Sequence, residues 1–177
     1  MAGPGAGGDE ILSSAAPSLS DDRVKEFERI YNEMVDDVFR YALSCVGRRE
    51  IAEEIAADVF LALYRNIAGV DREWVRPWLF RVAKNHATDY WRRRWTEQRL
   101  ASEAPPAATA EPGEAGWLLD NTDLKPSHRA CLLLRYVHGM ERDEISKVTG
   151  LTANQVKSCL QYGLQLLRKQ FKKGKAK

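Results

Sequence analysis

A stretch rich in proline, alanine, glycine and glutamate near the middle of the chain most constrains what this sequence can fold into. It occupies residues 101–116, with the sequence ASEAPPAATAEPGEAG. A segment without large apolar side chains cannot contribute to a hydrophobic core and is typical of a flexible linker. The sequence therefore predicts two modules, at residues 21–100 and 117–177, joined by this linker.

Residues 1–20 are also rich in Gly, Ala, Ser and Pro, and we expect a disordered leader there. Of the 177 residues, 44% are hydrophobic and 29% are charged, which is enough apolar content for two small cores. No apolar run approaches the roughly 18 residues of a membrane span, and no signal peptide is recognisable. We expect a cytoplasmic protein without membrane insertion.

Apolar residues in the front module recur at intervals of three and four, the period of an amphipathic helix. The three successive stripes are Phe27, Ile30, Tyr31, Met34, Val38, Tyr41, Ala42 and Cys45, then Ile51, Ile55, Val59, Phe60 and Leu63, then Val75, Trp78, Leu79, Val82, Ala83, His86, Ala87 and Tyr90. No segment shows the alternation of a β-strand. The sequence thus predicts helices throughout this module.

The back module has the same period in shorter pieces. Trp117 begins a short element, and Pro126 opens a helix that ends at Gly139. The residues expected to face inward on that helix are Cys131, Leu132, Leu134 and Val137. Two further helices are expected over residues 141–149 and 153–171.

Residues 141–169 combine the features of a helix-turn-helix. Gly150 permits a tight turn, Leu151 fills the corner, and Thr152 with Gln155 forms a capping box. The alternative, a helical hairpin with a polar face, leaves this combination unexplained. Asn, Gln and Lys on the outer face of such a helix can read base edges in the major groove. The candidates for DNA binding are Thr152, Asn154, Gln155, Lys157, Ser158, Gln161 and Arg168. The predicted fold class is all-α, with two small helical domains and a C-terminal helix-turn-helix.

The segment 74–95, WVRPWLFRVAKNHATDYWRRRW, holds four of the five tryptophans, and residues 76–94 hold six basic residues against one acid. Aromatic faces stack on unpaired bases while arginines hold the backbone, so this composition favours single-stranded or melted DNA. Alternatively, the aromatics belong to a core. We expect Trp78, Leu79, Val82 and Tyr90 to be buried, and the pattern leaves Trp91 and Trp95 undecided.

Charge is distributed unevenly along the chain. Residues 21–60 hold eleven acidic and six basic residues, whereas residues 157–177 hold seven basic residues and no acid. The basic segments suit phosphate, and the acidic segment suits a basic protein surface.

The three cysteines form no CxxC pair, and no catalytic motif is recognisable, so we expect neither an enzyme nor a metal or cofactor site.

The order of these segments resembles the extracytoplasmic-function (ECF) group of bacterial sigma factors. AEEIAADVFLALYRNI (52–67) resembles the polymerase-binding helix of that family, and RPWLFRVAKNHATDYWRRR (76–94) resembles its promoter-melting helix. LKPSHRACLLLRYVHGMERDEISKVTGLTANQVKSCL (124–160) resembles its C-terminal helix-turn-helix. The resemblance implies three partners, namely core RNA polymerase, promoter DNA in duplex and melted form, and an anti-sigma factor.

The resemblance also implies roles for particular residues. The polymerase-binding residues would be Glu53, Glu54, Asp58, Phe60 and Leu61. The loop over 66–77 and the helix after it would recognise and open the minus-ten element. The residues involved in melting would be Trp78, Arg81, Lys84, Asn85, Asp89, Arg92 and Arg93. Asn85 would grip an extruded base, and the second helix of the helix-turn-helix would bind the minus-thirty-five element.

The chain departs from the family pattern at several positions. Ala57 stands where a polar residue is common, which implies a weaker polymerase contact, and Ser146 stands where Ala is usual. Gln161, Tyr162 and Gln165 replace arginines, which implies an unusual promoter sequence. The alternative to a sigma factor is a free-standing regulator that dimerises through its front module. The basic aromatic helix argues against this alternative, because a dimerisation domain does not need one.

Overall fold

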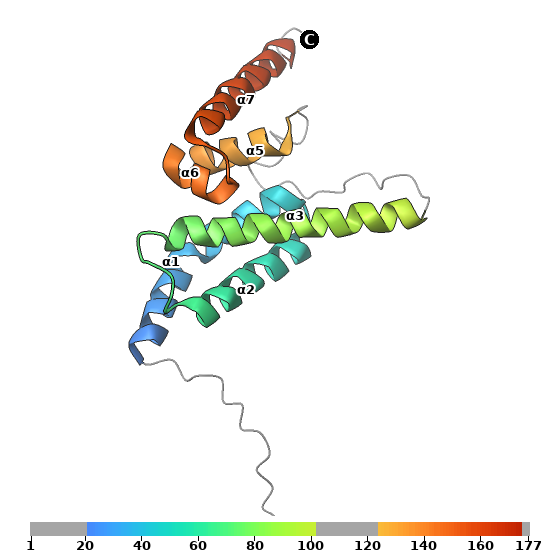
Figure 1. Cartoon of the computed structure of the whole chain (residues 1–177). Coiled ribbons are helices and arrows are strands. Elements are labelled where there is room, and N and C mark those ends of the chain that lie inside the picture. The colour runs from blue at the N-terminus through green and yellow to red at the C-terminus, as the bar shows by residue number, and fades with distance from the viewer. Residues whose placement is uncertain (1–20, 102–123, 175–177) are drawn as a thin grey trace, which may run out of the picture.

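The structure is a computed structural model that describes residues 21–101 and 124–174, and every element within these ranges is a helix (Figure 1). The N-terminal domain contains α1 (Asp21–Val46), α2 (Arg49–Asn66) and α3 (Val75–Ala101). The C-terminal domain contains α5 (Pro126–Leu132), the π-helical turn η1 (Leu133–Val137), α6 (Arg142–Thr149) and α7 (Ala153–Gly174). The predicted fold class is confirmed. The expected leader, nearly all of the linker and the element at Trp117 lie outside the described residues.

In the N-terminal domain, α1, α2 and α3 pack against one another around an apolar core. The completely buried side chains are Val38, Tyr41, Val59, Leu63, Leu79 and Phe80, with Ala42, Ala52 and Ala83 between them. All come from the three helices that the apolar period predicts. The prediction was wrong for Tyr31, whose side chain is 41% exposed. Instead of entering the core, its ring lies in edge-to-face geometry with the Phe60 ring, with 4.8 Å between the ring centres.

The loop between α2 and α3 is tied to α1 by a bidentate ion pair. Arg72 Nε and Nη2 donate to the two carboxylate oxygens of Glu26 at 2.8 and 2.5 Å, and Arg29 donates to the same carboxylate at 3.0 Å. The guanidinium groups of Arg72 and Arg29 lower the pKa of Glu26 to about 2. This pair holds the segment just before α3 and thereby orients the start of that helix.

In the C-terminal domain, α7 crosses α5 at close range. A Cβ atom at Gly163 would lie 2.8 Å from Leu132 Cδ1, so only glycine fits this crossing without a shift. The predicted capping box is confirmed, since Thr152 N–H donates to Gln155 Oε1 at 2.8 Å and Gln155 N–H donates to Thr152 Oγ1 at 3.3 Å. Gly150 has φ +77°, the left-handed conformation that the turn requires.

The helix that starts at Pro126 ends differently from the prediction. Its last turn, η1, is π-helical, and the His138 N–H donates to the Leu133 carbonyl at 3.1 Å. A π turn inserts one residue into the helical register and rotates the side chains that follow it. Val137, which we expected to face inward, is therefore 47% exposed, and His138 is buried instead.

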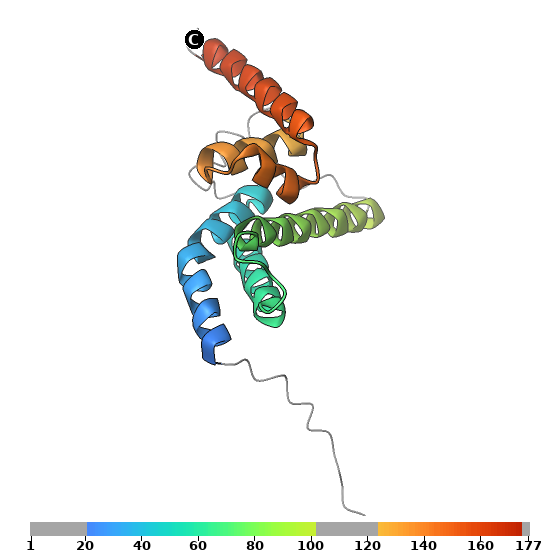
Figure 2. The same ribbon diagram turned by 60° about the vertical axis from the view of Figure 1, so that its left-hand side comes forward.

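The two domains contact each other, and α6 packs on α3. Both views place the C-terminal domain on the side of α3 that faces away from α2 (Figures 1 and 2). Within the described ranges, no helix is both long enough and apolar enough to span a membrane.

Candidate functional site

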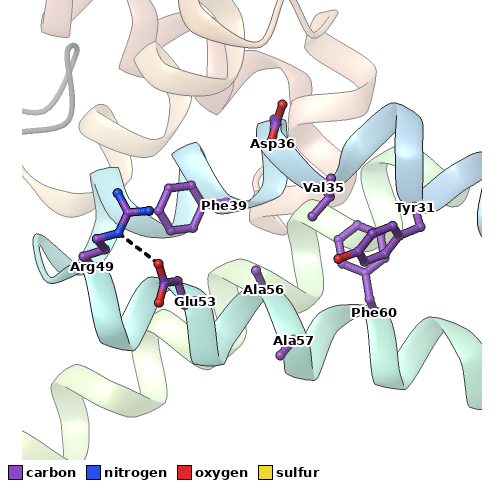
Figure 3. A pocket seen from close by; sticks show the side chains of 9 residues that line it. All are labelled: Tyr31, Val35, Asp36, Phe39, Arg49, Glu53, Ala56, Ala57 and Phe60. Atoms are coloured by element: carbon purple, nitrogen blue, oxygen red, sulfur yellow. Dashed lines mark ion pairs between the residues drawn. The ribbon is translucent and has the colours of Figure 1, made fainter.

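A groove of about 300 Å³ lies between α1 and α2 on the surface of the N-terminal domain (Figure 3). The residues that line it are Tyr31, Val35, Asp36, Phe39, Arg49, Glu53, Ala56, Ala57 and Phe60. The two alanines of α2 lie between an aromatic pair at one end of the groove and a charged group at the other. Because alanine side chains are short, they leave a hollow with an apolar floor between the helices.

The charged end of the groove is held together by local interactions. Arg49 Nε lies 2.9 Å from Glu53 Oε1, and the Arg49 guanidinium lies 5.5 Å from the centre of the Phe39 ring. Asp36 also lines the groove, on the α1 side. The groove therefore offers apolar contact area flanked by the Asp36 carboxylate and the Arg49–Glu53 ion pair, a combination that suits an apolar segment with polar or charged neighbours.

The structure separates the five residues predicted to bind polymerase. Glu53 and Phe60 line the groove, although Phe60 is only 3% exposed and therefore offers a partner little surface. Asp58 lies toward α3, where its carboxylate is 3.5 Å from His86 Nδ1. Glu54 and Leu61 are exposed outside the groove.

The prediction missed the contribution of α1 to this groove. Tyr31, Val35, Asp36 and Phe39 come from that helix. The apolar period assigned Tyr31 to the core, and the acidity of residues 21–60 was the available signal that the helix also presents a binding surface.

The residues predicted to melt DNA divide between two sides of α3. Arg81, Asn85 and Arg92 are exposed and lie four and seven residues apart, so they share one face of the helix. Asp89 forms an ion pair with Arg92, which keeps the Arg92 side chain near this face. Arg93 is exposed on an adjacent face. The three residues on the shared face form a basic strip with an amide at its centre, suited to phosphates and one unpaired base.

Lys84 and Trp78 lie apart from this face. Lys84 is half-buried and lines a cavity of about 600 Å³ between the domains. Trp78 is half-buried and packs against the core, as do Val82 and Tyr90, whereas Leu79 is fully buried. Trp91 donates its indole N–H to the Cys45 carbonyl at 3.0 Å, so its ring joins α3 to the end of α1.

The outer face of α7 carries the residues predicted to read duplex DNA. Asn154, Lys157, Ser158, Gln161 and Arg168 are all exposed. Thr152 and Gln155 are exposed as well, but their side chains bond to each other in the capping box. The Gln155 amide nitrogen keeps its donor capacity, whereas its oxygen already accepts from Thr152.

Two residues of the segment before α6 join this face, and sequence reasoning did not identify them. Lys125 and His128 help to line a hollow of about 590 Å³ together with Asn154, Ser158 and Tyr162. The ring of Tyr162, which is 51% exposed, lies 5.0 Å from that of His128. Lys125 and His128 precede the helix-turn-helix segment by more than ten residues, so only the folded domain reveals their position.

Comparison with known proteins identifies both domains. The family model "Sigma-70 region 2" matches residues 30–97, and "Sigma-70, region 4" matches residues 123–167. The ECF RNA polymerase sigma factor SigM of Bacillus subtilis is 27% identical over 159 residues, which cover 83% of this chain and 96% of SigM. SigL of Mycobacterium tuberculosis, also an ECF RNA polymerase sigma factor, is 28% identical over 151 residues, which cover 78% of this chain and 85% of SigL.

Solved structures agree on the fold. The sigma factor RpoE of Bartonella quintana, crystallised with the anti-sigma factor NepR, superposes with a TM-score of 0.73 at 16% identity. The match covers 84% of this chain and 98% of RpoE. Matches to both sigma domains in the same order, and to relatives along nearly their whole length, lead to one conclusion. This chain is a sigma factor of the ECF group, which directs core RNA polymerase to promoters and is not an enzyme.

Proposed function

We propose that the groove between α1 and α2 is the surface that docks on core RNA polymerase. We assign opening of the minus-ten element to the face of α3 around Asn85, and reading of the minus-thirty-five element to the outer face of α7. In this proposal the functional domains extend over residues 21–100 and 117–177, and the protein acts in the cytoplasm, where RNA polymerase works.

The groove supports this assignment most strongly. It combines an apolar floor at Ala56 and Ala57 with the Asp36 carboxylate and the Arg49–Glu53 ion pair. Its lining residues come from α1 and α2, whereas the exposed basic residues Arg81, Arg92 and Arg93 lie on α3. A protein partner can therefore occupy the groove while DNA occupies the basic surfaces, as transcription initiation requires.

The same surfaces suit an inhibitor. RpoE of Bartonella quintana was crystallised with the anti-sigma factor NepR. By analogy, we propose that an anti-sigma factor also holds this chain inactive by covering surfaces that polymerase and DNA need. Co-purification of the inhibitor with the chain, and loss of transcription when it is added back, would support this assignment.

Filling the groove tests the docking surface. Ala57 is exposed and lines the groove, so Ala57→Trp should occupy the hollow without disturbing the core. We expect this variant to bind core RNA polymerase at least tenfold more weakly and to lose promoter-dependent transcription to the same extent. Ala57→Ser, which leaves the groove open, should behave as the wild type. Unchanged polymerase affinity in Ala57→Trp would exclude the groove as the docking site.

A gel-shift assay of promoter binding, with and without core RNA polymerase, distinguishes a sigma factor from a free-standing regulator. The two sigma-domain matches do not favour the regulator. A sigma factor should bind its promoter weakly when alone and open it with core polymerase. Sequencing the transcripts from such a reaction would also give the promoter sequence.

A further inference from the structure

The connection between α2 and α3, which we call the α2–α3 loop, spans residues 67–74 and ends in a tight turn. The Asp71 carboxylate accepts a hydrogen bond from the Glu73 N–H at 3.2 Å, and the Asp71 carbonyl accepts one from the Trp74 N–H at 2.9 Å. These bonds are local, so they shape the turn without fixing its position relative to α1.

Arg72, in the middle of this turn, attaches the α2–α3 loop to α1. Its Nε and Nη2 atoms donate to Oε1 and Oε2 of Glu26 at 2.8 and 2.5 Å, which is the two-point geometry of a strong arginine–carboxylate pair. Among the described residues, no other side chain of the loop forms a hydrogen bond to another helix. The position of the loop against α1 therefore depends on this pair.

The Glu26 carboxylate is itself held in place by α1. Arg29, one turn further along, donates Nη2 to Oε1 at 3.0 Å and Nε to Oε2 at 3.3 Å, and it also pairs with Glu33 at 3.0 Å. The side chain of Glu26 is 19% exposed, whereas that of Arg72 is 73% exposed. A carboxylate with four donors and little exposed surface has a fixed orientation, so Glu26 sets the position of Arg72.

The pairing also neutralises a cation close to the DNA-opening helix. Arg72 precedes α3 by three residues, where an unpaired guanidinium would attract phosphate. Two positive and two negative charges cancel in the network that contains it, which consists of Glu26, Arg29, Glu33 and Arg72. The geometry therefore suits Arg72 to hold the loop rather than to attract DNA.

The α2–α3 loop is close enough to Asn85 to act on the same stretch of promoter. It leads directly into α3, and Asn85 lies about 16 Å from its end at 1.5 Å per helical residue. At 3.4 Å per nucleotide, this distance corresponds to about five nucleotides. A shift of the loop would therefore change how neighbouring bases of one promoter element meet α3.

We propose that Glu26 is a positioning residue for promoter recognition. Through Arg72, it fixes the α2–α3 loop in the arrangement that distinguishes the bases of the minus-ten element, which α3 then opens. Glu26 acts through Arg72 and does not itself contact DNA. This inference rests on the proposed function, because it uses the assignment of the minus-ten element to α3.

The ratio of transcription from two templates tests the proposal. One template carries a promoter identified by sequencing the transcripts that core RNA polymerase makes with the wild-type chain. The other differs at one base of the minus-ten element, chosen because the change lowers wild-type transcription. A variant that folds less well or binds polymerase less well loses transcription from both templates equally, so the ratio reports base recognition alone.

The variants are Glu26→Gln, Arg72→Gln and the double substitution. Glu28→Gln is the control, because Glu28 is exposed on the same helix and the substitution removes the same charge. We expect Glu26→Gln and Arg72→Gln each to lower the ratio about threefold to tenfold, the effect of losing an oriented ion pair. The double variant should lose no more than Arg72→Gln, and the control should keep the wild-type ratio.

Three results would overturn the proposal. A wild-type ratio in Glu26→Gln would show that the loop recognises bases without this attachment. Higher transcription of Glu26→Gln from the intact promoter would show that Arg72 is a phosphate contact that Glu26 restrains. Losses that multiply in the double variant would show that the two residues act independently. Failure of the proposed function is distinguishable, because core polymerase with the wild type would then make no promoter-specific transcripts.

Discussion

Asn85 lies between Arg81 and Arg92 on the exposed face of α3, and its amide makes no hydrogen bond to any other described side chain or backbone group. In the proposed function, this amide would bind an unpaired base while the arginines would contact the flanking phosphates. The atoms that a single residue leaves without a partner in the folded chain are the ones that it can offer to such a ligand.

We predict that Asn85→Ala reduces transcription from a fully paired promoter about 3- to 10-fold, equivalent to one lost hydrogen bond of about 1 kcal/mol. Transcription from a template with a preformed bubble at the minus-ten element should recover most of the activity, because melting is then no longer required. Glu97→Ala, an exposed change further along α3, serves as the control. Equal losses on both templates would contradict a role in melting.

Burial and exposure of single residues were predictable only in part. The helical period predicted that Asn85, Lys157 and Gln161 face outward, because the period alone determines which side of an isolated helix is polar. It could not predict that Asp58 faces His86, because that contact joins two helices. Whether an outward side chain is free or paired depends on neighbours that are distant in sequence.

Among the helices, α7 shows how packing constrains the face that we propose reads duplex DNA. Its inner face meets α5 closely at Gly163, where an added Cβ atom would require Leu132 to shift. The orientation of α7 on α5 therefore depends on this close crossing.

We predict that Gly163→Val destabilises the C-terminal domain by about 1–3 kcal/mol, because the added carbons overlap with Leu132. Thermal unfolding followed by circular dichroism measures this change. Valine has a higher helix propensity than glycine, so helix propensity alone would make Gly163→Val more stable. Gln165→Val, an exposed substitution on the same helix, measures the effect of valine at a position outside the close crossing. If both variants lose the same stability, the close crossing does not constrain α7.

For the whole molecule, the contact between the two domains should depend on pH. The imidazole of His138, in the C-terminal domain, packs 4.8 Å from the Phe80 ring of α3, and burial lowers its pKa from 6.5 to about 4. Asp37 of α1 partly opposes this shift, whereas Arg76 of α3 and Arg40 of α1 add to it. The neutral imidazole therefore favours the packed domains, and this preference is complete above about pH 6.5 and declines as the pH falls toward 4.

We predict that the contact between the two domains weakens by about 2 kcal/mol between pH 7 and pH 5, so that the radius of gyration of the wild type rises over this range. His138→Phe keeps the ring packing and cannot titrate, so it should remain compact over the same range. Small-angle X-ray scattering measured across the pH series checks both expectations. A wild-type value that stays constant to pH 5 would show that protonation of His138 does not weaken the contact.

The sequence by itself determined the helical class, the helix-turn-helix and the resemblance to ECF sigma factors. These follow from local period, turn residues and segment order, which each stretch of chain carries alone. Only the tertiary structure decided that Tyr31 and Phe39 share a groove with Ala57, that a π turn exposes Val137, and that His138 joins the two domains. The physical reason is that a groove or an interface arises between elements, and the periodicity of one helix does not specify which neighbour it meets.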